Sequence, residues 1–358
     1  AVNAAIRQHP ALTTMLEFDE DGDMMQRNRP ELFGTVRVED MSADLLETVR
    51  KTFVRPFMLF REPLCRARVI RSGAFTYLLM DMHHIISDGT SMDILAEDIA
   101  KLLRGEEPGQ DYYYSFLQRE SDEKRSEAYR RSERYFRDLL GDGRWTNVPT
   151  PDHVSWEPEK GVEMLDMELT LQDMARAEAR LGASGNVLCI TAAILALQEY
   201  CHDHRILVEW LNSNRGDSYY DDTVGKLFKI LPIAVHTERF EDLKALIAEV
   251  NRQVAGGFIN SRCNYMEDVE QALEDSMDIN YLVGIGENDP LVALGAEELS
   301  PDCTYDAVGE RAGIYIERWE DTLGVTIEYQ KKAYADGSMA RFLAMFKKHL
   351  RAIVLEKI

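Results

Sequence analysis

Two adjacent histidines, His83 and His84, precede Asp88 and Gly89 within the stretch MDMHHIISDGTS, residues 80–91. A histidine side chain titrates close to neutral pH, so it can accept or donate a proton in a reaction, and a nearby aspartate can hold its ring in place. The same residue types also form metal sites and ordinary Asp-Gly turns. The spacing of the residues has to separate these three interpretations.

The spacing argues against a metal site. The run AFTYLLMDMHH, residues 74–84, is rich in aromatic and aliphatic residues and predicts a central strand. Side chains alternate along a strand, so His83 and His84 should point to opposite faces and cannot both bind one ion. A structural turn and an acid/base histidine at a strand end both remain open.

The motif should lie between a strand and a helix. Gly89, Thr90 and Ser91 offer turn and capping chemistry. The apolar residues that follow have helical spacing and are Met92, Leu95, Ile99 and Leu102. Such a junction exposes backbone N–H groups at a helix N-terminus, where polar groups can be bound.

Composition limits the partners that the chain can have. With 358 residues, 45% of them hydrophobic and 29% charged, it is long enough for one large domain or two lobes with a real core. Its net charge of −22 would repel nucleic acid and anionic membrane surfaces over most of the surface. We therefore expect neither partner.

Cysteine usage and hydropathy favour a cytoplasmic protein. The cysteines are scattered without a C-x-x-C pair and are Cys65, Cys189, Cys201, Cys263 and Cys303. The most apolar stretch, residues 186–197, is too short to cross a bilayer and predicts a buried helix. The opening AVNAAIRQHPAL has no basic n-region, so we expect no signal peptide and a piece of a longer chain.

Strand and helix patterns recur in both halves and predict a mixed α/β architecture of two lobes. A stretch rich in Gly and Pro, residues 141–161, predicts a boundary near residue 155, with lobes 1–155 and 156–358. Residues 122–140 predict one charged helix. Near the start, two strands flank an Asp-Gly turn whose aspartates suggest a calcium loop, but Pro30 stands where the closing glutamate belongs, so a solvated turn fits better.

The stretch MHHIISDGTS resembles the signature of nonribosomal peptide synthetase condensation domains, within the chloramphenicol acetyltransferase-like acyltransferase superfamily. RPFMLFREPLCRARVI and RQHPALTTML resemble earlier family segments, and residues 206–235 resemble a segment of the second lobe, with Arg215 and Gly225 in place. The likeness spans most of the chain. Departures from the family pattern surround the motif and are Thr13, Tyr113, Leu117, Asn214, Lys229 and Ile230.

The resemblance implies a V-shaped pair of lobes, a monomeric pseudo-dimer, with a tunnel between them. Two phosphopantetheine arms of carrier proteins would enter from opposite ends, one with a donor acyl thioester and the other with an acceptor amine, with no permanently bound cofactor. The partners would be donor and acceptor peptidyl carrier proteins and adjoining adenylation domains of a larger synthetase. The reaction would form a peptide bond.

The resemblance also implies roles for the motif residues. His84 matches the catalytic histidine, and His83 would pack inside the lobe. Asp88 matches an aspartate that supports the structure through an ion pair, for which Arg215 is the candidate, and Gly89 would offer its N–H to an acyl oxygen. A basic helical face could receive an acidic carrier protein or be merely solvated, and its residues are Lys124, Arg125, Arg130, Arg131 and Arg134.

Three other functions stay open. An epimerization domain shares the motif but adds a glutamate-containing motif that this sequence lacks. An acyltransferase that uses coenzyme A thioesters would form an ester or amide with the same histidine. A catalytically silent docking module of the same fold would need neither His84 nor Asp88.

Overall fold

The computed structural model describes residues 1–141, 143–155, 159–216, 218–269, 276–284, 290–295 and 312–356. The chain groups into two compact units. The first contains Ala1–Arg119, Ser213–Phe228 and the described residues 290–295, and the second contains Glu120–Asn212, Lys229–Gly284 and the described residues 312–356. The division near residue 155 stays a prediction, and Cys303 lies outside the described residues.

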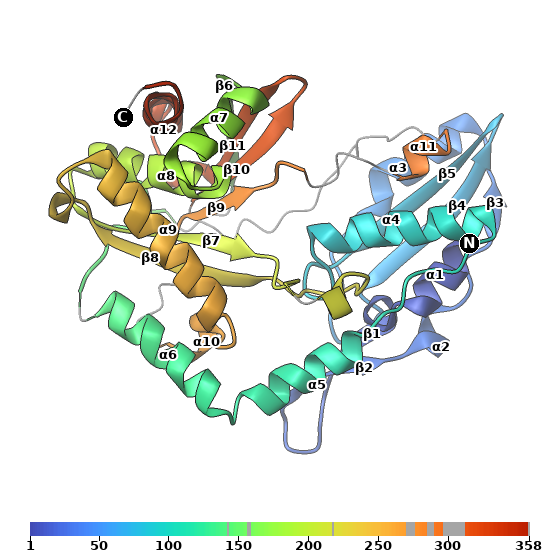
Figure 1. Ribbon diagram of the computed structural model, residues 1–358. Helices are drawn as coiled ribbons and strands as arrows, with labels where there is room; N and C mark the ends of the chain where they lie inside the picture. Colours follow the sequence, from blue (N-terminus) through green and yellow to red (C-terminus); the bar gives the residue numbers. More distant parts are fainter. Residues whose placement is uncertain are drawn as a thin grey trace. The chain divides into compact units, whose positions relative to one another are not determined.

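The first unit begins with a helix and a hairpin. Figure 1 labels its elements, which are α1 (Val2–Gln8), η1 (Pro10–Thr13), β1 (Thr14–Phe18), β2 (Met24–Asn28), α2 (Pro30–Phe33), β3 (Val38–Asp40), α3 (Ala43–Phe53), β4 (Cys65–Ser72), β5 (Phe75–Met82), α4 (Gly89–Arg104), η2 (Ser218–Tyr220) and α11 (Pro290–Ala293). In the hairpin turn, Asp19 Oδ1 accepts hydrogen bonds from the backbone N–H groups of Asp21 and Asp23. Oδ1 of Asp19, one of the oxygens that a calcium ion would need, thus binds the backbone of the turn.

A three-stranded mixed sheet carries the motif. β4 pairs with β3 in parallel and with β5 antiparallel. β5 ends at Met82, so the prediction of a strand through residue 84 was wrong at its end. His83 still donates its N–H to the carbonyl of Leu64, 2.9 Å away, but the chain then turns instead of continuing the ladder. Strand alternation therefore does not set the directions of the two histidines.

The second unit is built on a six-stranded mixed sheet of order β6-β11-β10-β9-β7-β8. Parallel pairs join β9 to β10 and to β7, and the other pairs are antiparallel. The strands are β6 (Lys160–Thr170), β7 (Arg205–Asn212), β8 (Lys229–His236), β9 (Asp278–Tyr281), β10 (Ala312–Trp319) and β11 (Thr322–Gln330). These strands confirm the predicted mixed α/β class.

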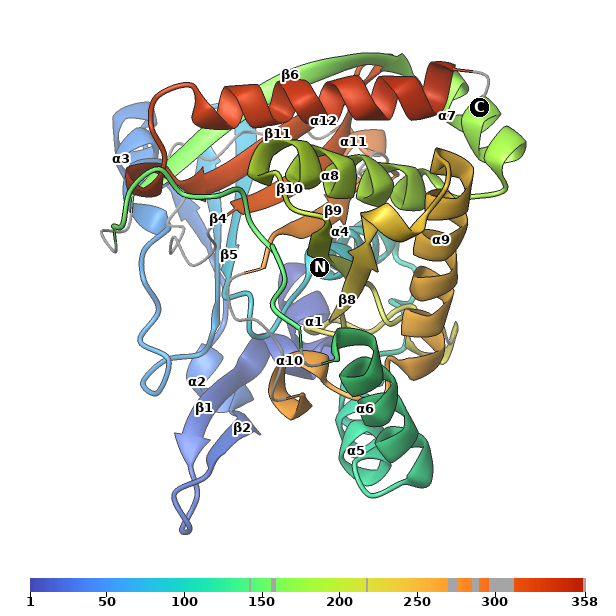
Figure 2. The ribbon, with the colours of Figure 1, turned by 90° about the vertical axis from the view of Figure 1, so that its left-hand side faces the viewer.

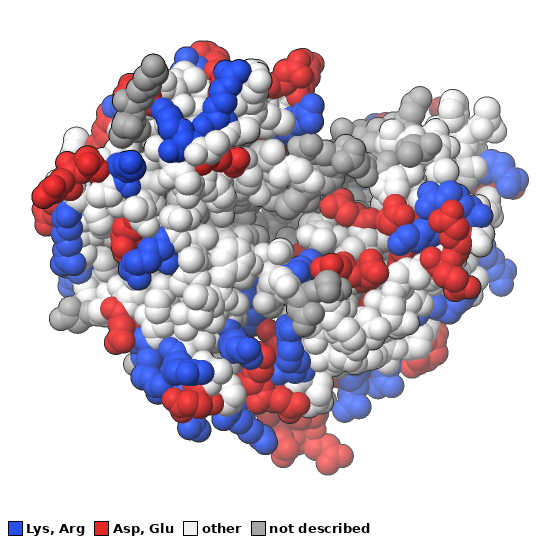
Figure 3. All heavy atoms as spheres, in the orientation of Figure 1, with Lys and Arg blue, Asp and Glu red and all other residues white. Residues whose placement is uncertain are grey.

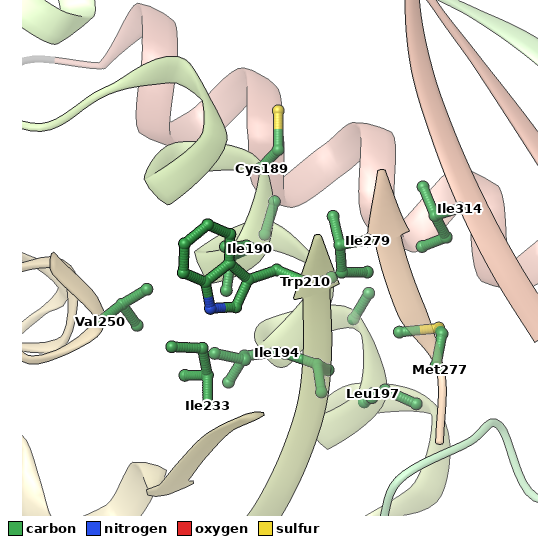
Figure 4. Packing of buried hydrophobic residues seen from close by; sticks show 14 of the residues in the cluster. Cys189, Ile190, Ile194, Leu197, Trp210, Ile233, Val250, Met277, Ile279 and Ile314 are labelled. Carbon is green, nitrogen blue, oxygen red and sulfur yellow. The ribbon is translucent and has the colours of Figure 1, made fainter. Parts of the chain in front are cut away.

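Helices cover this sheet and form the larger core. The helices of the unit are α6 (Glu127–Leu140), α7 (Leu171–Leu181), α8 (Gly185–Cys201), η3 (Thr237–Arg239), α9 (Leu243–Asn260), α10 (Tyr265–Asp268), η4 (Lys331–Ala333) and α12 (Ser338–Leu355). α8, α9 and α12 lie against the sheet in Figure 2. Figure 4 shows α8 side chains beside Trp210 and Ile279 of the strands, in one cluster that also contains Ile314. Most residues of α8 are apolar and buried, as expected of a helix that the core surrounds over most of its length.

The charged helix predicted over residues 122–140 is two helices. α5 (Tyr113–Glu123) ends before Lys124, and α6 starts after Ser126. Ser126 is the N-cap of α6, since its hydroxyl accepts a hydrogen bond from the Tyr129 N–H at 3.0 Å. The prediction of one helix was therefore wrong at residues 124–126, where Ser126 starts a new helix.

No single helix among the described residues is long and apolar enough to cross a membrane, although the bent pair α7 and α8 passes by length and composition. α8 is largely buried in the core, which explains its composition. Within the same residues no group of three or more His, Cys, Asp or Glu side chains is placed to hold a metal ion.

Candidate active site

The site lies in the loop between β5 and α4, in the first unit. The loop turns sharply at the histidines, since Ile86 donates its N–H to the carbonyl of His83 at 3.0 Å. Ser87 also donates its hydroxyl to that carbonyl, at 3.3 Å. Ile86, Ser87 and Asp88 are buried, whereas His84 and Gly89 are exposed. The buried residues 86–88 thus hold the loop in place, while His84 and Gly89 are accessible to solvent.

His84 is held in one orientation and one tautomer. Its Nδ1 lies 2.7 Å from the carbonyl oxygen of Ser87. A carbonyl oxygen only accepts, so Nδ1 carries the hydrogen and the neutral ring has its lone pair on Nε2. The ring of Phe228 packs edge-on against it, with centroids 5.8 Å apart. His84 is an exposed residue, and this arrangement leaves its Nε2 lone pair to accept a proton.

His83 supports the turn. Its Nδ1 accepts a hydrogen bond from the N–H of Ile85 at 3.1 Å, and its ring meets Phe57 edge-on at 5.9 Å. Burial lowers the pKa of His83 below its ordinary value, and the adjacent His84 lowers it further. Because the Nδ1 lone pair of the neutral His83 ring accepts the Ile85 N–H, it is not available to a substrate, and His83 has a structural role.

Asp88 is the N-cap of α4. Its Oδ1 accepts hydrogen bonds from the N–H of Ser91 at 2.8 Å and from the Ser91 hydroxyl at 2.7 Å, and the N–H of Asp88 lies 3.2 Å from the same hydroxyl. These reciprocal contacts form a capping box that stabilises the helix start. The sequence pattern predicted capping from residues 89–91 but did not identify Asp88 as the cap.

The structure brings Asp88 and Arg215 together. Arg215 Nη2 lies 3.0 Å from Oδ1 and 3.1 Å from Oδ2 of Asp88, and both side chains are only 7% exposed. Arg215 Nη1 donates to the carbonyls of Tyr220 and Thr223, at 3.1 and 2.7 Å. The ion pair therefore fastens the segment 213–228, which we call the crossing segment, to the start of α4.

Further contacts fasten the crossing segment at Gly225. The N–H of Gly225 donates to the Ser91 hydroxyl at 3.1 Å, and the N–H of Leu227 donates to Asp88 Oδ2 at 3.1 Å. A Cβ atom at Gly225 would lie 2.7 Å from Cε2 of Tyr113, which is too close for a side chain. The close approach requires glycine at this position.

Gly89 is the first residue of α4 and is exposed. The N–H of a first helical residue has no partner inside its helix, and the helix N-terminus favours negative charge. The group is therefore available to a developing oxyanion.

Asn214 shows why one departure from the family pattern is tolerated. Its φ is 56°, in the left-handed region that glycine adopts most easily and asparagine next. Its side-chain amide also donates to the carbonyl of Leu227 at 3.0 Å. Replacement of the usual glycine thus costs little and adds a contact within the crossing segment.

Sequence reasoning missed the roles of two residues of the site. The Ser91 hydroxyl contacts both Asp88 and Gly225, and the Phe228 ring packs against His84. The Asp-x-x-Ser spacing of a capping box could have indicated Ser91. The position of Phe228 depends on contacts between residues more than a hundred apart in sequence, which no local pattern reports.

Residues 1–285 match the family of condensation domains. Bacitracin synthase 1 of Bacillus licheniformis is 29% identical over 262 residues, 70% of this chain and 5% of that protein. Gramicidin S synthase 2 of Aneurinibacillus migulanus is 27% identical over 250 residues, 66% of this chain and 6% of that protein. The chain thus spans about a twentieth of the length of these curated relatives.

Solved structures share the fold. The epimerization domain from the third module of tyrocidine synthetase B has a TM-score of 0.75 at 19% identity, covering 99% of this chain and 87% of that one. The first condensation domain of the calcium-dependent antibiotic synthetase has a TM-score of 0.73 at 17% identity, with 99% and 87% covered. The X-domain from teicoplanin biosynthesis has a TM-score of 0.78 at 15% identity, with 99% and 86% covered. With the family match over most of its length, the chain belongs to the condensation domains of nonribosomal peptide synthetases.

Proposed function

We propose that this domain forms an amide bond between an acyl or aminoacyl donor, bound as a thioester to one carrier protein, and the amine of an acceptor on a second carrier. His84, Gly89, Asp88 and Arg215 would be the residues that serve the reaction. The observation that carries the proposal is the exposed His84 ring, whose Nδ1 is bound to the Ser87 carbonyl and whose Nε2 is left to accept a proton.

The reaction needs little from the protein beyond position and one proton acceptor. The amine nitrogen attacks the thioester carbonyl, the C–N bond forms, and the C–S bond breaks to release the phosphopantetheine thiol. Nε2 of His84 accepts the proton that the amine loses, and the departing thiolate takes up that proton. The N–H of Gly89 would stabilise the negative oxygen of the tetrahedral intermediate.

Magnitudes favour proximity as the larger contribution. An α-amine has a pKa of about 7.7 to 8.0, so about a tenth to a fifth of it is already nucleophilic at pH 7. Positioning of two reactants can contribute about 7 to 11 kcal/mol, whereas acid/base help typically gives about 10² to 10⁴-fold. We therefore expect His84 to orient the amine and take its proton late.

Acidic carrier proteins would need a local basic surface on this acidic domain. Blue atoms of Lys and Arg gather over the position of α6 in Figure 3. There Arg134 pairs with Glu127 at 2.8 Å, which removes part of the positive charge. Lys124, Arg125 and Arg131 are exposed and have no ion-pair partner among the described residues. We propose these three as the carrier contact.

The test incubates the chain with carriers loaded with donor and acceptor and weighs the products by mass spectrometry. The unaltered chain should form the amide, and His84→Ala should slow it by about 10²-fold, at the low end of acid/base catalysis. His153→Ala, at an exposed histidine of the second unit, is the matched control and should keep the full rate.

Three outcomes would contradict the proposal. Deuterium exchange at the α-carbon of a loaded aminoacyl group would indicate epimerization. Amide formation from coenzyme A thioesters as fast as from carriers would indicate a free-standing acyltransferase. Binding of carriers without any product above the uncatalysed rate would indicate a docking module.

A further inference from the structure

A second histidine, His9, lies fully buried in the first unit. Its Nδ1 is 2.7 Å from Asp111 Oδ2 and its Nε2 is 3.0 Å from Asp98 Oδ2. The ring is 0% exposed and both carboxylate side chains are 1% exposed. His9, Asp98 and Asp111 form what we call the buried bridge, which the reaction described above does not use.

The geometry requires two hydrogens in the buried bridge, one in each N···O contact. Ionised carboxylates only accept hydrogen bonds, so both ring nitrogens must donate and the ring must be an imidazolium. Backbone donors also bind the other carboxylate oxygens: the Gly109 N–H lies 2.8 Å from Asp98 Oδ1, and the Tyr113 N–H lies 2.7 Å from Asp111 Oδ1.

The electrostatic surroundings agree with a charged ring. Burial alone would lower the pKa of His9, but the hydrogen bonds and charges of Asp111 and Asp98 outweigh it, so that the pKa is raised above 6.5. Burial opposes ionisation of Asp98, yet His9 and the Gly109 N–H hold the pKa of that carboxyl below its ordinary value. Lys101 of α4, 3.3 Å from Asp98, and Asp222, packed on Gly109, are further charged groups beside the bridge.

The buried bridge reaches the crossing segment directly. Asp111 Oδ2, the oxygen bound to His9, also accepts the N–H of Val224 at 3.1 Å. The Tyr112 N–H donates to the Thr223 hydroxyl at 3.2 Å. Gly225, the residue after Val224, is hydrogen-bonded to Ser91 at the start of α4. Without the positive charge of His9, the two buried carboxylates would lose the cation between them, and Asp111, which accepts the Val224 N–H, would lose its charged partner.

We infer that His9 is a positioning residue: through Asp111 its imidazolium fixes the crossing segment against the start of α4, and so fixes Phe228 beside His84. The effect on the reaction rests on the proposed function, whereas the effect on the crossing segment does not. Since the folded pKa of His9 lies above the unfolded one, its contribution is complete below about pH 6.5 and is lost as the pH rises through the folded pKa.

The first test is structural. Hydrogen exchange of the Val224, Gly225 and Leu227 amides, corrected for the intrinsic rate, should speed up about tenfold or more in His9→Gln, since a charge-assisted contact is lost. His9→Gln with Asp98→Asn removes one of the two buried carboxylates, keeps both Asp111 oxygens for the Tyr113 and Val224 N–H groups, and should regain part of the protection. His349→Gln, which breaks a 2.7 Å histidine–glutamate contact in the second unit, should leave these amides unchanged.

The second test can be made on the unaltered chain, so it does not depend on whether His9→Gln folds. Nitrogen NMR over a pH titration should show one histidine ring that keeps both nitrogens protonated to a higher pH than a histidine of the unfolded chain, and this ring should be absent from the double variant. A His9 that loses its proton at or below the pH of an unfolded-chain histidine, or equal protection of Val224 in His9→Gln, would overturn the inference.

The third test concerns the reaction. The amide-forming rate of the unaltered chain should fall at alkaline pH, and this fall should be absent from the double variant. If His9 had only a structural role, the substitution would lower the rate at every pH and leave the shape of the pH profile unchanged. An unchanged alkaline fall would overturn the positioning role. A chain without activity, but with the exchange pattern above, would refute only the proposed function.

Discussion

The buried pair of Asp88 and Arg215 gives a stability prediction that can be worked from the structure. Asp88→Ala removes a helix cap, about 1 kcal/mol, and leaves the Arg215 guanidinium unpaired at 7% exposure. Breaking a buried pair by removing one partner costs about 3 to 5 kcal/mol. Since a domain has only about 5 to 15 kcal/mol of stability, this change should remove about a quarter of it or more.

A double-mutant cycle separates the pair from the cap. Arg215→Met leaves Asp88 bound to the N–H groups of Ser91 and Leu227, so its cost should lie near 3 kcal/mol. With both changes no unpaired charge remains, and the double variant should be more stable than the sum of single effects by about 2 kcal/mol or more. Arg134→Met, in a pair that is 58% and 63% exposed, is the matched control and should cost at most about 1 kcal/mol.

Urea unfolding with two probes measures these effects. The tryptophans that the structure describes, Trp145, Trp210 and Trp319, belong to the second unit, so their fluorescence reports that unit, whereas far-UV circular dichroism reports both. The Asp88 and Arg215 variants should shift the dichroism transition more than the fluorescence transition. A coupling energy below about 0.5 kcal/mol, or a loss as small as that of Arg134→Met, would refute the reasoning.

The remaining predictions concern chemistry and packing. His84→Ala should slow transfer to an alcohol acceptor more than to a matched amine, because a neutral alcohol must lose its proton as it attacks, and equal losses in paired rate measurements would contradict this. Gly225→Ala should cost about 1 to 3 kcal/mol in urea unfolding, since its Cβ would meet Tyr113 at 2.7 Å, and an unchanged midpoint would show that the ring can move. Burial raises the pKa of Cys65 to about 12, so iodoacetamide at about pH 8 should leave it unmodified in the folded chain and label it in urea, as peptide mapping can show.

Local sequence patterns predicted the elements well and their ends less well. The alternation rule extended β5 through His84, but the chain turns after Met82 because His83 and Ser87 bond within the loop. The charged run on both sides of Ser126 favoured a continuous helix and hid the cap of α6. Ends depend on single side-chain hydrogen bonds, which periodicity does not report.

The site divides into parts that the sequence could and could not predict. Types and spacing indicated an acid/base histidine, and the family resemblance supplied Arg215 as the partner of Asp88. No pattern placed His9 near Val224, because the contact joins residues far apart in the chain through Asp111. Such a link becomes visible only when the fold brings the residues together.

The placement of charge explains why the motif can stay intact while its surroundings vary. Asp88 and Arg215 are buried and bonded to backbone groups of the crossing segment, and His9 is buried between two carboxylates, one of which accepts the Val224 N–H. Their charges therefore hold the crossing segment rather than act on a substrate. His84 and Gly89 alone of the motif are exposed, and each is fixed by backbone contacts or by the helix start. A substitution such as Asn214 that keeps the backbone conformation therefore leaves the reactive groups in place. Under the proposed function, the identity of the acyl groups should then depend on residues outside the motif, which is where this sequence departs from its family.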